Sequence, residues 1–237
     1  ARPWKETRMR SQTGIRALTS RPSWLKDRSL LILGLSGLVL RLVLMPLAMH
    51  VDPDFVGDII YINQAALRSI SGTEVQSAYP PLALLTIGIF ESVWLPPALP
   101  SLPTGAEAQL RILSDSSIFR QIFFPKLLFL IFDLATGYLL WWMADRWQEK
   151  RGVTAFWFLN PLVIYNGYFH AQFDLIAVFF VVLAFSLARQ DRPVMSAFWL
   201  GIAGSYKIFP FLFLLPLVIL SRGSWRQKVS MLVIGAT

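Results

Sequence analysis

Long apolar runs, separated by short basic segments, constrain this chain more than any other feature of its sequence. The first run covers residues 29–49, and a helix of that length would extend about 30 Å, which matches the hydrocarbon thickness of a bilayer. Of the 237 residues, 55% are hydrophobic and only 15% are charged, a composition too apolar for a soluble domain of this size. We therefore predict an all-α fold, a polytopic bundle of transmembrane helices.

The basic residues are unevenly distributed. The net charge of +8 would indicate a nucleic-acid partner in a soluble protein, but here eight Lys or Arg residues fall within residues 1–28. Further basic clusters follow later apolar runs, at residues 144–151, 189–192 and 221–228. The positive-inside rule places such segments in the cytoplasm. We predict a basic cytoplasmic tail over residues 1–28, a transmembrane module over residues 29–237 and no nucleic-acid partner.

The ends of the sequence and its lack of cysteine give two further expectations. The sequence starts without Met and stops at Thr237 within an apolar run, so we expect a C-terminal part of the protein beyond this residue. Cysteine is absent, which excludes disulfides and thiolate metal sites.

The section from residue 50 to about residue 124 is richer in acidic than in basic residues. We therefore place this section outside the cytoplasm. Within it, residues 58–70 have apolar side chains mostly at helical spacing, typical of a helix on the membrane surface. Residues 80–95 form an apolar run that is short and interrupted by Glu91. This run predicts a re-entrant or interfacial helix, with Pro80 and Pro81 suited to its first turn.

The remaining apolar runs cover residues 124–142, 153–169, 175–187 and 193–220. Asn160-Pro161 predicts a kink within the second of these runs. Basic segments at both ends of the last run predict a hairpin of two short helices that breaks near residues 207–210. The alternative is one long tilted helix with a proline kink, which would invert the orientation of everything that follows.

Three aspartates follow the first apolar run. Asp58 can act as a general base toward a hydroxyl, or can simply cap the surface helix that starts there. The D-x-D spacing of Asp52 and Asp54 permits a divalent cation, but two acids around a proline form a turn more often, and we favour the turn. We therefore expect no cofactor and no metal.

A polar turn joins the runs that end at residue 169 and begin at residue 175. His170 can serve as a base, as a hydrogen-bond donor to a phosphate, or as an aromatic side chain at the membrane interface. Gln172 lies two residues further along the chain. The two histidines of the chain are far apart in sequence, so a metal site is unsupported. Asp174 can take part in catalysis or pair with Lys126 or Lys207, which would lower the cost of both charges.

Two cations lie within apolar stretches, where a lipid phosphate would suit them. Lys207 follows Gly204-Ser-Tyr206, and the alternative of snorkelling to the interface fits it less well than it fits Arg41. Tyr79 precedes the two prolines that stiffen the entry to the re-entrant helix, and we include it among the residues expected to bind the donor or the substrate.

Six short motifs follow one another between residues 30 and 220. They are Gly57-Asp58, Tyr79-Pro-Pro-Leu82, F-x-K-L-L-F-x-x-x-D-L, F-W-x-L-N-P-L, His170-x-Gln172-Phe-Asp174 and G-x-A-x-S-x-K-x-x-P. Their order resembles that of the GT-C fold glycosyltransferases. The segment from Asp58 is similar to one in the catalytic subunit of GPI mannosyltransferase I and in related bacterial mannosyltransferases, and the histidine turn is similar to that of glucosyltransferases acting on lipid-linked oligosaccharides.

The resemblance implies a transferase that moves a sugar, such as mannose, from a polyprenyl phosphate to a hydroxyl of a lipid or glycan acceptor on the extracytoplasmic face. Asp58 would then be the base. Lys207, together with Arg41 and Lys126, would hold the donor phosphate. His170, Gln172 and Asp174 would shape the donor pocket. One departure bears on metal use, because the D-x-D of the mannosyltransferase includes its catalytic aspartate whereas Gly57 precedes Asp58 here.

Two alternatives to the enzyme remain open at this stage. The first is a non-catalytic GT-C-like subunit that works with other membrane subunits in a larger complex. The second is a transporter, which predicts polar residues facing one another through the bilayer, and the cytoplasmic halves of these runs contain few. For location we expect a multi-pass protein among membrane lipids, in a bacterial plasma membrane rather than the ER membrane.

Overall fold

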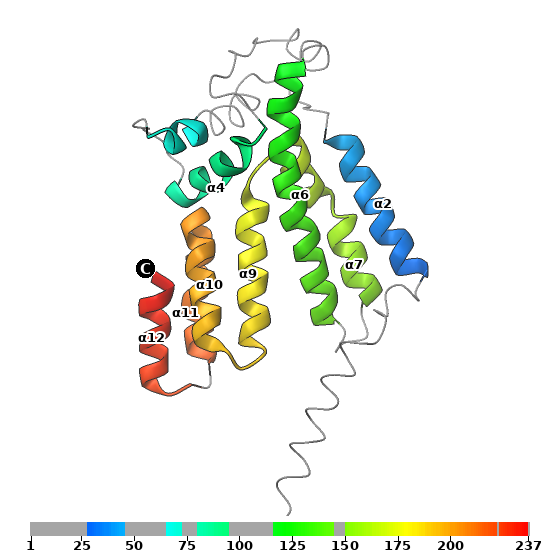
Figure 1. Ribbon diagram of the computed structural model, residues 1–237. Coiled ribbons are helices and arrows are strands. Elements are labelled where there is room, and N and C mark those ends of the chain that lie inside the picture. The colour runs from blue at the N-terminus through cyan, green and yellow to red at the C-terminus, as the bar shows by residue number, and fades with distance from the viewer. Residues whose placement is uncertain are drawn as a thin grey trace, which may run out of the picture.

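The computed structural model describes residues 28–45, 65–72, 80–94, 116–144, 150–221 and 223–236, and every regular element within these ranges is a helix. Figure 1 shows most of these helices side by side in one bundle. We call the end at which α6 and α9 begin the upper end, and the end at which α7 and α12 begin the lower end. The prediction of an all-α fold is confirmed for this part of the chain.

Helix α6, Ser116–Ala144, forms the centre of the bundle. Its segment Phe123–Ala144 is, among the described residues, the one helix both long and apolar enough to cross a bilayer, at about 33 Å. On one side α6 packs against α9, Asp174–Ala188, and on the other against α7, Lys150–Phe158, and through it α2, Arg28–Leu44. The other apolar helices in the described part of the chain are shorter than a bilayer span, so the polytopic arrangement stays a prediction.

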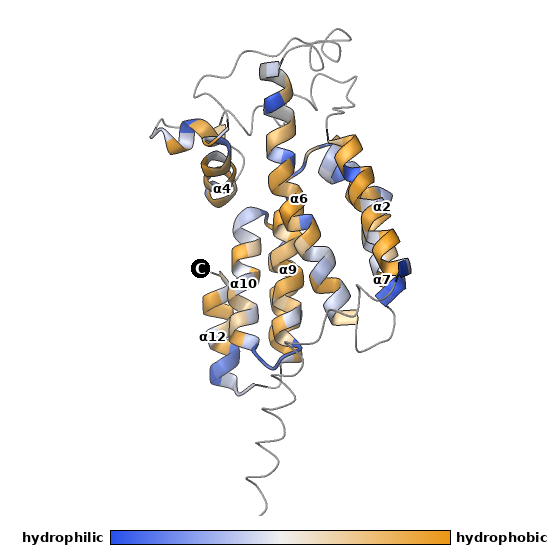
Figure 2. Cartoon of the chain, turned by 45° about the vertical axis from the view of Figure 1, so that its right-hand side comes forward, coloured by the Kyte–Doolittle hydropathy of each residue, from blue (hydrophilic) through white to orange (hydrophobic). Residues whose placement is uncertain are grey.

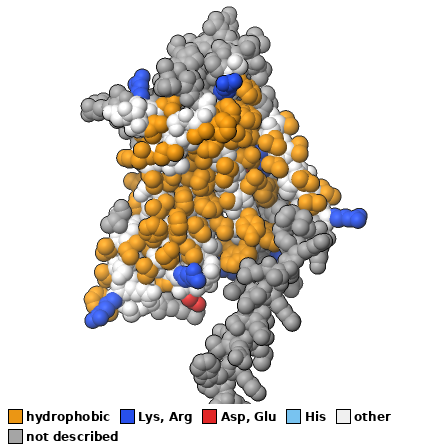
Figure 3. Space-filling model, viewed as in Figure 1, with side chains coloured by type: hydrophobic (Ala, Val, Ile, Leu, Met, Phe, Trp, Pro, Cys, Tyr) orange, Lys and Arg blue, Asp and Glu red, His pale blue; other side chains and the backbone are white. Residues whose placement is uncertain are grey.

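The surface and the interior of the bundle show an inverted distribution of polarity. Large apolar side chains face outward, with exposed fractions of 62% for Ile32 and 77% for Leu212, and hydrophobic side chains cover the face in Figure 3. The hydropathy colouring of Figure 2 shows long apolar stretches in most of the helices, with hydrophilic residues mainly near their ends. Arg41, Lys126 and Asp133, by contrast, are buried. A charged interior beneath an apolar surface is typical of proteins whose solvent is lipid.

The last apolar run forms the predicted hairpin. Helix α10, Pro193–Tyr206, runs upward, the chain breaks at Lys207 in an extended conformation, and a 3-10 turn η4, Phe209–Phe213, leads into α11, Leu214–Leu220. The two arms pack against each other (Figure 1). Gly204 permits this reversal, because a Cβ there would overlap the ring of Phe211.

The hairpin places the later basic segments at one end of the bundle. The turn that contains Arg189 and Arg192, the start of α7 and the start of α12, Trp225–Ala236, all lie at the lower end in Figure 1. This is the arrangement that the positive-inside rule required of the sequence. A single long helix over residues 193–220 is therefore excluded.

The predicted kink at Asn160-Pro161 is also present. Helix α7 ends at Phe158, and the Asn160 side chain accepts a hydrogen bond of 2.9 Å from the Leu162 amide as the cap of α8, Pro161–Ile164. A π-helical turn η3, Tyr165–Phe169, follows. Turns of this type occur often at functional sites.

Helix α4, Pro81–Glu91, is short as predicted, has Pro81 in its first turn, and lies over the upper end of α10 (Figure 1). Of the predicted surface helix, residues 65–70 are described and helical. They pack directly on α4, since a Cβ at Gly88 would lie 2.5 Å from the carbonyl oxygen of Ala66. The predicted site residues Asp52, Asp54, Asp58 and Tyr79 lie outside the described residues.

Candidate functional site

Four of the predicted site residues meet at the upper end of the bundle. His170 follows η3, Ala171 adopts a left-handed φ of 52°, and Asp174 begins α9 after Gln172. Lys207 ends α10 and forms an ion pair with Asp174. The predicted pairing of Asp174 with Lys207 is thus confirmed. We call residues 170–174 the polar turn.

The ion pair fits the helix ends that carry it. Asp174 lies in the first turn of α9, where a carboxylate is favoured by the helix dipole, and Lys207 caps the C-terminus of α10, where a cation is favoured. The side chains are 38% exposed for Lys207 and 28% for Asp174. An ion pair this exposed contributes at most about 1 kcal/mol, so an incoming anion can replace Asp174 as the partner of the lysine.

The other two predicted site residues, His170 and Gln172, are half-buried. The His170 Nε2 atom lies 3.0 Å from the Tyr165 hydroxyl, and its ring centre is 4.6 Å from that of Tyr165. The backbone N–H of Gln172 donates a hydrogen bond of 2.9 Å to the backbone carbonyl of Asn166, which closes the turn over η3. The Tyr165 contact holds the His170 ring, and the backbone bond fixes the position of residue 172 two residues before Asp174.

Helix α4 contacts the end of α10 beside Lys207. The Thr86 Oγ1 atom and the Tyr206 hydroxyl lie 2.6 Å apart, one residue before Lys207. Because residues 65–70 pack on α4 at Gly88, the segment that follows Asp58 in sequence is linked through α4 to the lysine. Sequence reasoning did not find Thr86 or Tyr206, since neither lies in a charged motif.

A second polar cluster is buried in the bundle and centres on Asp133. Its carboxylate accepts hydrogen bonds from the Arg41 Nε at 2.5 Å, the Trp157 Nε1 at 2.8 Å and the Tyr168 hydroxyl at 2.8 Å. The Arg41 and Asp133 side chains have no exposed surface. We call these four residues the Asp133 network. It joins α2, α6, α7 and η3, and Tyr168 connects it to the turn that carries His170.

From the sequence, Arg41 was expected to bind a lipid phosphate or to snorkel to the membrane interface, and the structure places it in neither position. Its guanidinium donates to Asp133 and also to the Phe158 carbonyl at 2.7 Å and the Gly37 carbonyl at 3.1 Å. The snorkelling alternative is wrong, because the side chain does not reach the surface. Asp133 is the aspartate of the F-x-K-L-L-F-x-x-x-D-L motif in the apolar run of residues 124–142, but nothing in the sequence showed that its partner lies 92 residues away.

Lys126 also has an internal partner. It is buried, and its Nζ donates a hydrogen bond of 3.0 Å to the Met45 carbonyl just after α2. The last carbonyls of a helix lack intrahelical donors, so the lysine caps the end of α2. The alternative pairing of Asp174 with Lys126 is not the one that forms.

Glu91 was not identified as a site residue from the sequence. It ends α4, has no exposed surface, and both carboxylate oxygens lack a hydrogen-bond partner among the described residues. Burial raises the pKa of the Glu91 carboxyl well above its usual range. The group is therefore protonated under conditions in which an ordinary glutamate is charged.

Within the described residues, no group of three or more His, Asp or Glu side chains is arranged to hold a metal ion. The D-x-D aspartates lie outside these residues. Lys207 and the polar turn together offer a half-exposed cation, an imidazole and a side-chain amide, a set suited to binding a phosphate and a polar ligand.

Comparison with known proteins decides the family. The family model described as GPI transamidase subunit PIG-U matches residues 98–234, more than half of the chain. The chain belongs to the PIG-U family. The matched range contains Asp133 and the polar turn as well as Lys207, so both polar clusters lie largely within the PIG-U region.

This PIG-U family member is similar to three curated fungal proteins named GPI mannosyltransferase 1. The identities are 29% over 96 residues for Candida albicans, 25% over 95 for Kluyveromyces lactis and 27% over 105 for Eremothecium gossypii. These matches cover 38%, 39% and 44% of the chain, and 24%, 23% and 26% of the relatives, so the chain spans about a quarter of their length. No solved structure matches.

The comparisons confirm the resemblance to GPI mannosyltransferase-like GT-C proteins. They do not support the expected bacterial plasma membrane, because the three relatives are fungal.

Proposed function

We propose that this chain is part of an integral membrane mannosyltransferase. It would transfer mannose from a polyprenyl phosphate to a hydroxyl of a lipid or glycan acceptor at the extracytoplasmic face. The observation that carries the proposal is the exposed Asp174–Lys207 pair at the upper end, where α9 begins and α10 ends beside the polar turn. Broken helices with polar ends are how helical membrane proteins build sites for anionic ligands. The similarity to GPI mannosyltransferase 1 supplies the sugar.

In this mechanism Lys207 exchanges Asp174 for the donor phosphate and stabilises the negative charge that develops on it. The acceptor oxygen attacks the anomeric carbon, the bond from that carbon to the phosphate oxygen breaks, and polyprenyl phosphate leaves. Asp58 takes the acceptor proton. His170 and Gln172 bind the sugar or its phosphate, with Tyr79 at the entry to α4.

The two remaining cations have supporting positions in this proposal. Arg41 holds η3 in place through the Asp133 network, and Lys126 holds the end of α2. For location we favour the ER membrane, because the curated relatives are fungal. The basic lower end then faces the cytoplasm and the polar turn faces the lumen.

The test is sugar transfer in membranes that hold the full-length protein, with a panel of labelled polyprenyl-phosphate sugars. We expect wild type to consume the mannose donor, and Asp58→Asn and Lys207→Met to be inert although correctly inserted. Lys228→Met is the matched control, because it removes the same charge at the lower end and should retain activity. Transfer by Lys207→Met at the wild-type rate would remove the lysine from the mechanism.

The family match favours a second candidate, a non-catalytic subunit of a membrane complex, because the matching family is described as a GPI transamidase subunit. A chain in that role would keep the bundle without turnover. It predicts no transfer from any donor, together with copurification at fixed stoichiometry with other membrane proteins. The same membranes distinguish the two candidates.

A further inference from the structure

A cavity of about 670 Å³ opens at the lower end of the bundle, opposite the candidate site. Its walls come from the ends of α6, α9 and α11 and the start of α12. Most of the lining is apolar and includes Phe185, Ala188, Pro216 and Leu217. Cavities of this size are typical of small-molecule sites.

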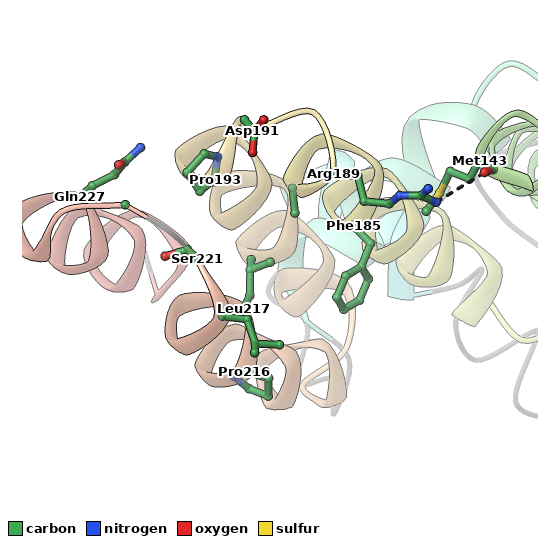
Figure 4. Close-up of a pocket in the computed structure, with 12 residues that line it drawn as sticks. Met143, Phe185, Arg189, Asp191, Pro193, Pro216, Leu217, Ser221 and Gln227 are labelled. Carbon is green, nitrogen blue, oxygen red and sulfur yellow. Dashed lines mark hydrogen bonds between the residues drawn. The ribbon is translucent and has the colours of Figure 1, made fainter. Parts of the chain in front are cut away.

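The polar residues of the cavity lie on its rim. Figure 4 shows Gln227 and Ser221 on one side, Arg189 on the other and Asp191 above. The Arg189 guanidinium crosses toward α6, where it donates a hydrogen bond of 3.4 Å to the Met143 carbonyl. One end of the cavity is thus polar while the body between α9 and α11 is apolar.

The surrounding charge is predominantly positive. Arg192 lies between two lining residues in the α9–α10 turn, and Arg226 precedes the lining residue Gln227. Lys228 is bonded to the Ile219 carbonyl, next to the lining residue Leu220. With Arg189 these make four cations among the described residues in and beside the lining, where Asp191 supplies the one carboxylate.

We propose that this cavity binds an anionic phospholipid of the cytoplasmic leaflet. Charge complementarity selects the headgroup, because basic residues at the cytoplasmic ends of helices attract anionic lipids. The apolar body between α9 and α11 accommodates an acyl chain, which lies at the correct depth when the basic end of the bundle is at the cytoplasmic interface. The inference rests on the membrane placement of the bundle and is independent of sugar transfer.

The test is lipid binding to the purified full-length protein, with native mass spectrometry as the readout. The probes are phosphatidylserine and phosphatidylcholine, titrated separately. We expect phosphatidylserine to bind more tightly. The double variant Arg189→Gln/Arg192→Gln should weaken its binding about 25-fold, because each basic residue near a membrane surface contributes about fivefold, while phosphatidylcholine binding stays unchanged. Glutamine at residue 189 keeps a donor for the Met143 carbonyl.

Two further variants separate the headgroup from the cavity. Arg68→Gln/Arg120→Gln removes the same charge from the upper end of the bundle, where Arg68 is exposed on the helix that packs on α4 and Arg120 is exposed on α6. This variant should leave the preference for phosphatidylserine intact. Ala188→Phe narrows the apolar body and should reduce binding of both lipids. If both arginine double variants lost phosphatidylserine binding equally, the proposal would be overturned, because attraction to the overall surface charge would then explain the preference. Lipid binding unaffected by Ala188→Phe and by Arg189→Gln/Arg192→Gln would also overturn it, and is the result expected if a later segment of the protein fills the cavity.

Discussion

The Asp133 network gives the sharpest prediction about what holds this bundle together. Asp133→Asn removes the carboxylate but keeps an amide that can bond Trp157 and Tyr168, so the main loss is the charge that balances Arg41. Arg41→Met is the reciprocal change and leaves a buried carboxylate with two neutral donors. The double variant removes both charges and retains a polar partner for the tryptophan and the tyrosine.

The expected magnitudes follow from the complete burial of the pair. Removing one partner of a buried ion pair costs about 3–5 kcal/mol, because the remaining charge is left uncompensated. If the two losses were independent, the double variant would lose about 6–10 kcal/mol. We expect instead that it loses less than either single variant. The coupling between Arg41 and Asp133 should therefore be at least about 3 kcal/mol.

The assay is reversible denaturant unfolding of the full-length protein in detergent micelles, with the free energy of unfolding taken for wild type, both single variants and the double variant. The matched control is the same cycle at the exposed pair, Lys207→Met with Asp174→Asn, for which we expect a coupling of about 1 kcal/mol or less. Additive losses at Arg41 and Asp133, or single variants within about 1 kcal/mol of wild type, would refute the argument from burial.

Three further predictions concern α4 and the hairpin. Glu91 has a raised pKa in the folded protein, so its contribution to stability is fully present at low pH and is lost as the pH rises above the unfolded value of about 4.3. Glu91→Leu should remove this part of the pH dependence in unfolding measurements from about pH 5 to 8, and an unchanged slope would exclude Glu91 as its source. Thr86→Val leaves the Tyr206 hydroxyl without its Thr86 partner and should lower the free energy of unfolding by about 1–2 kcal/mol, whereas Thr86→Ser should lower it less. Equal losses in denaturant unfolding would mean that the hydroxyl contact contributes nothing to stability. Gly204→Ala forces a Cβ into the Phe211 ring and should lower the thermal midpoint, while Gly34→Ala, which meets open space, should not; a stable Gly204→Ala protein would argue against the close packing of the hairpin.

The elements that sequence reasoning predicted well are those with a local physical cause. Proline cannot donate a backbone hydrogen bond, so Pro81 and Pro161 begin helices and Asn160 interrupts one, as expected. The hairpin at Lys207 followed from charge, because two basic segments had to lie on the same side of the membrane. The pairing of Asp174 with Lys207 was one of two alternatives, and both residues lie at helix ends that favour their charges.

The residues that sequence reasoning misplaced are those whose partners are distant and whose helices are apolar all around. Helix α2 has no polar face, so nothing local shows which side carries Arg41 toward Asp133. The same holds for Glu91, whose burial depends on how α4 packs. The sequence alone determined where the described helices of the later apolar runs lie and that the last run turns back on itself, because apolar length, proline and terminal charge act within a segment. Only the tertiary structure decided which buried charges meet, because helix packing sets which faces are brought together across nearly a hundred residues.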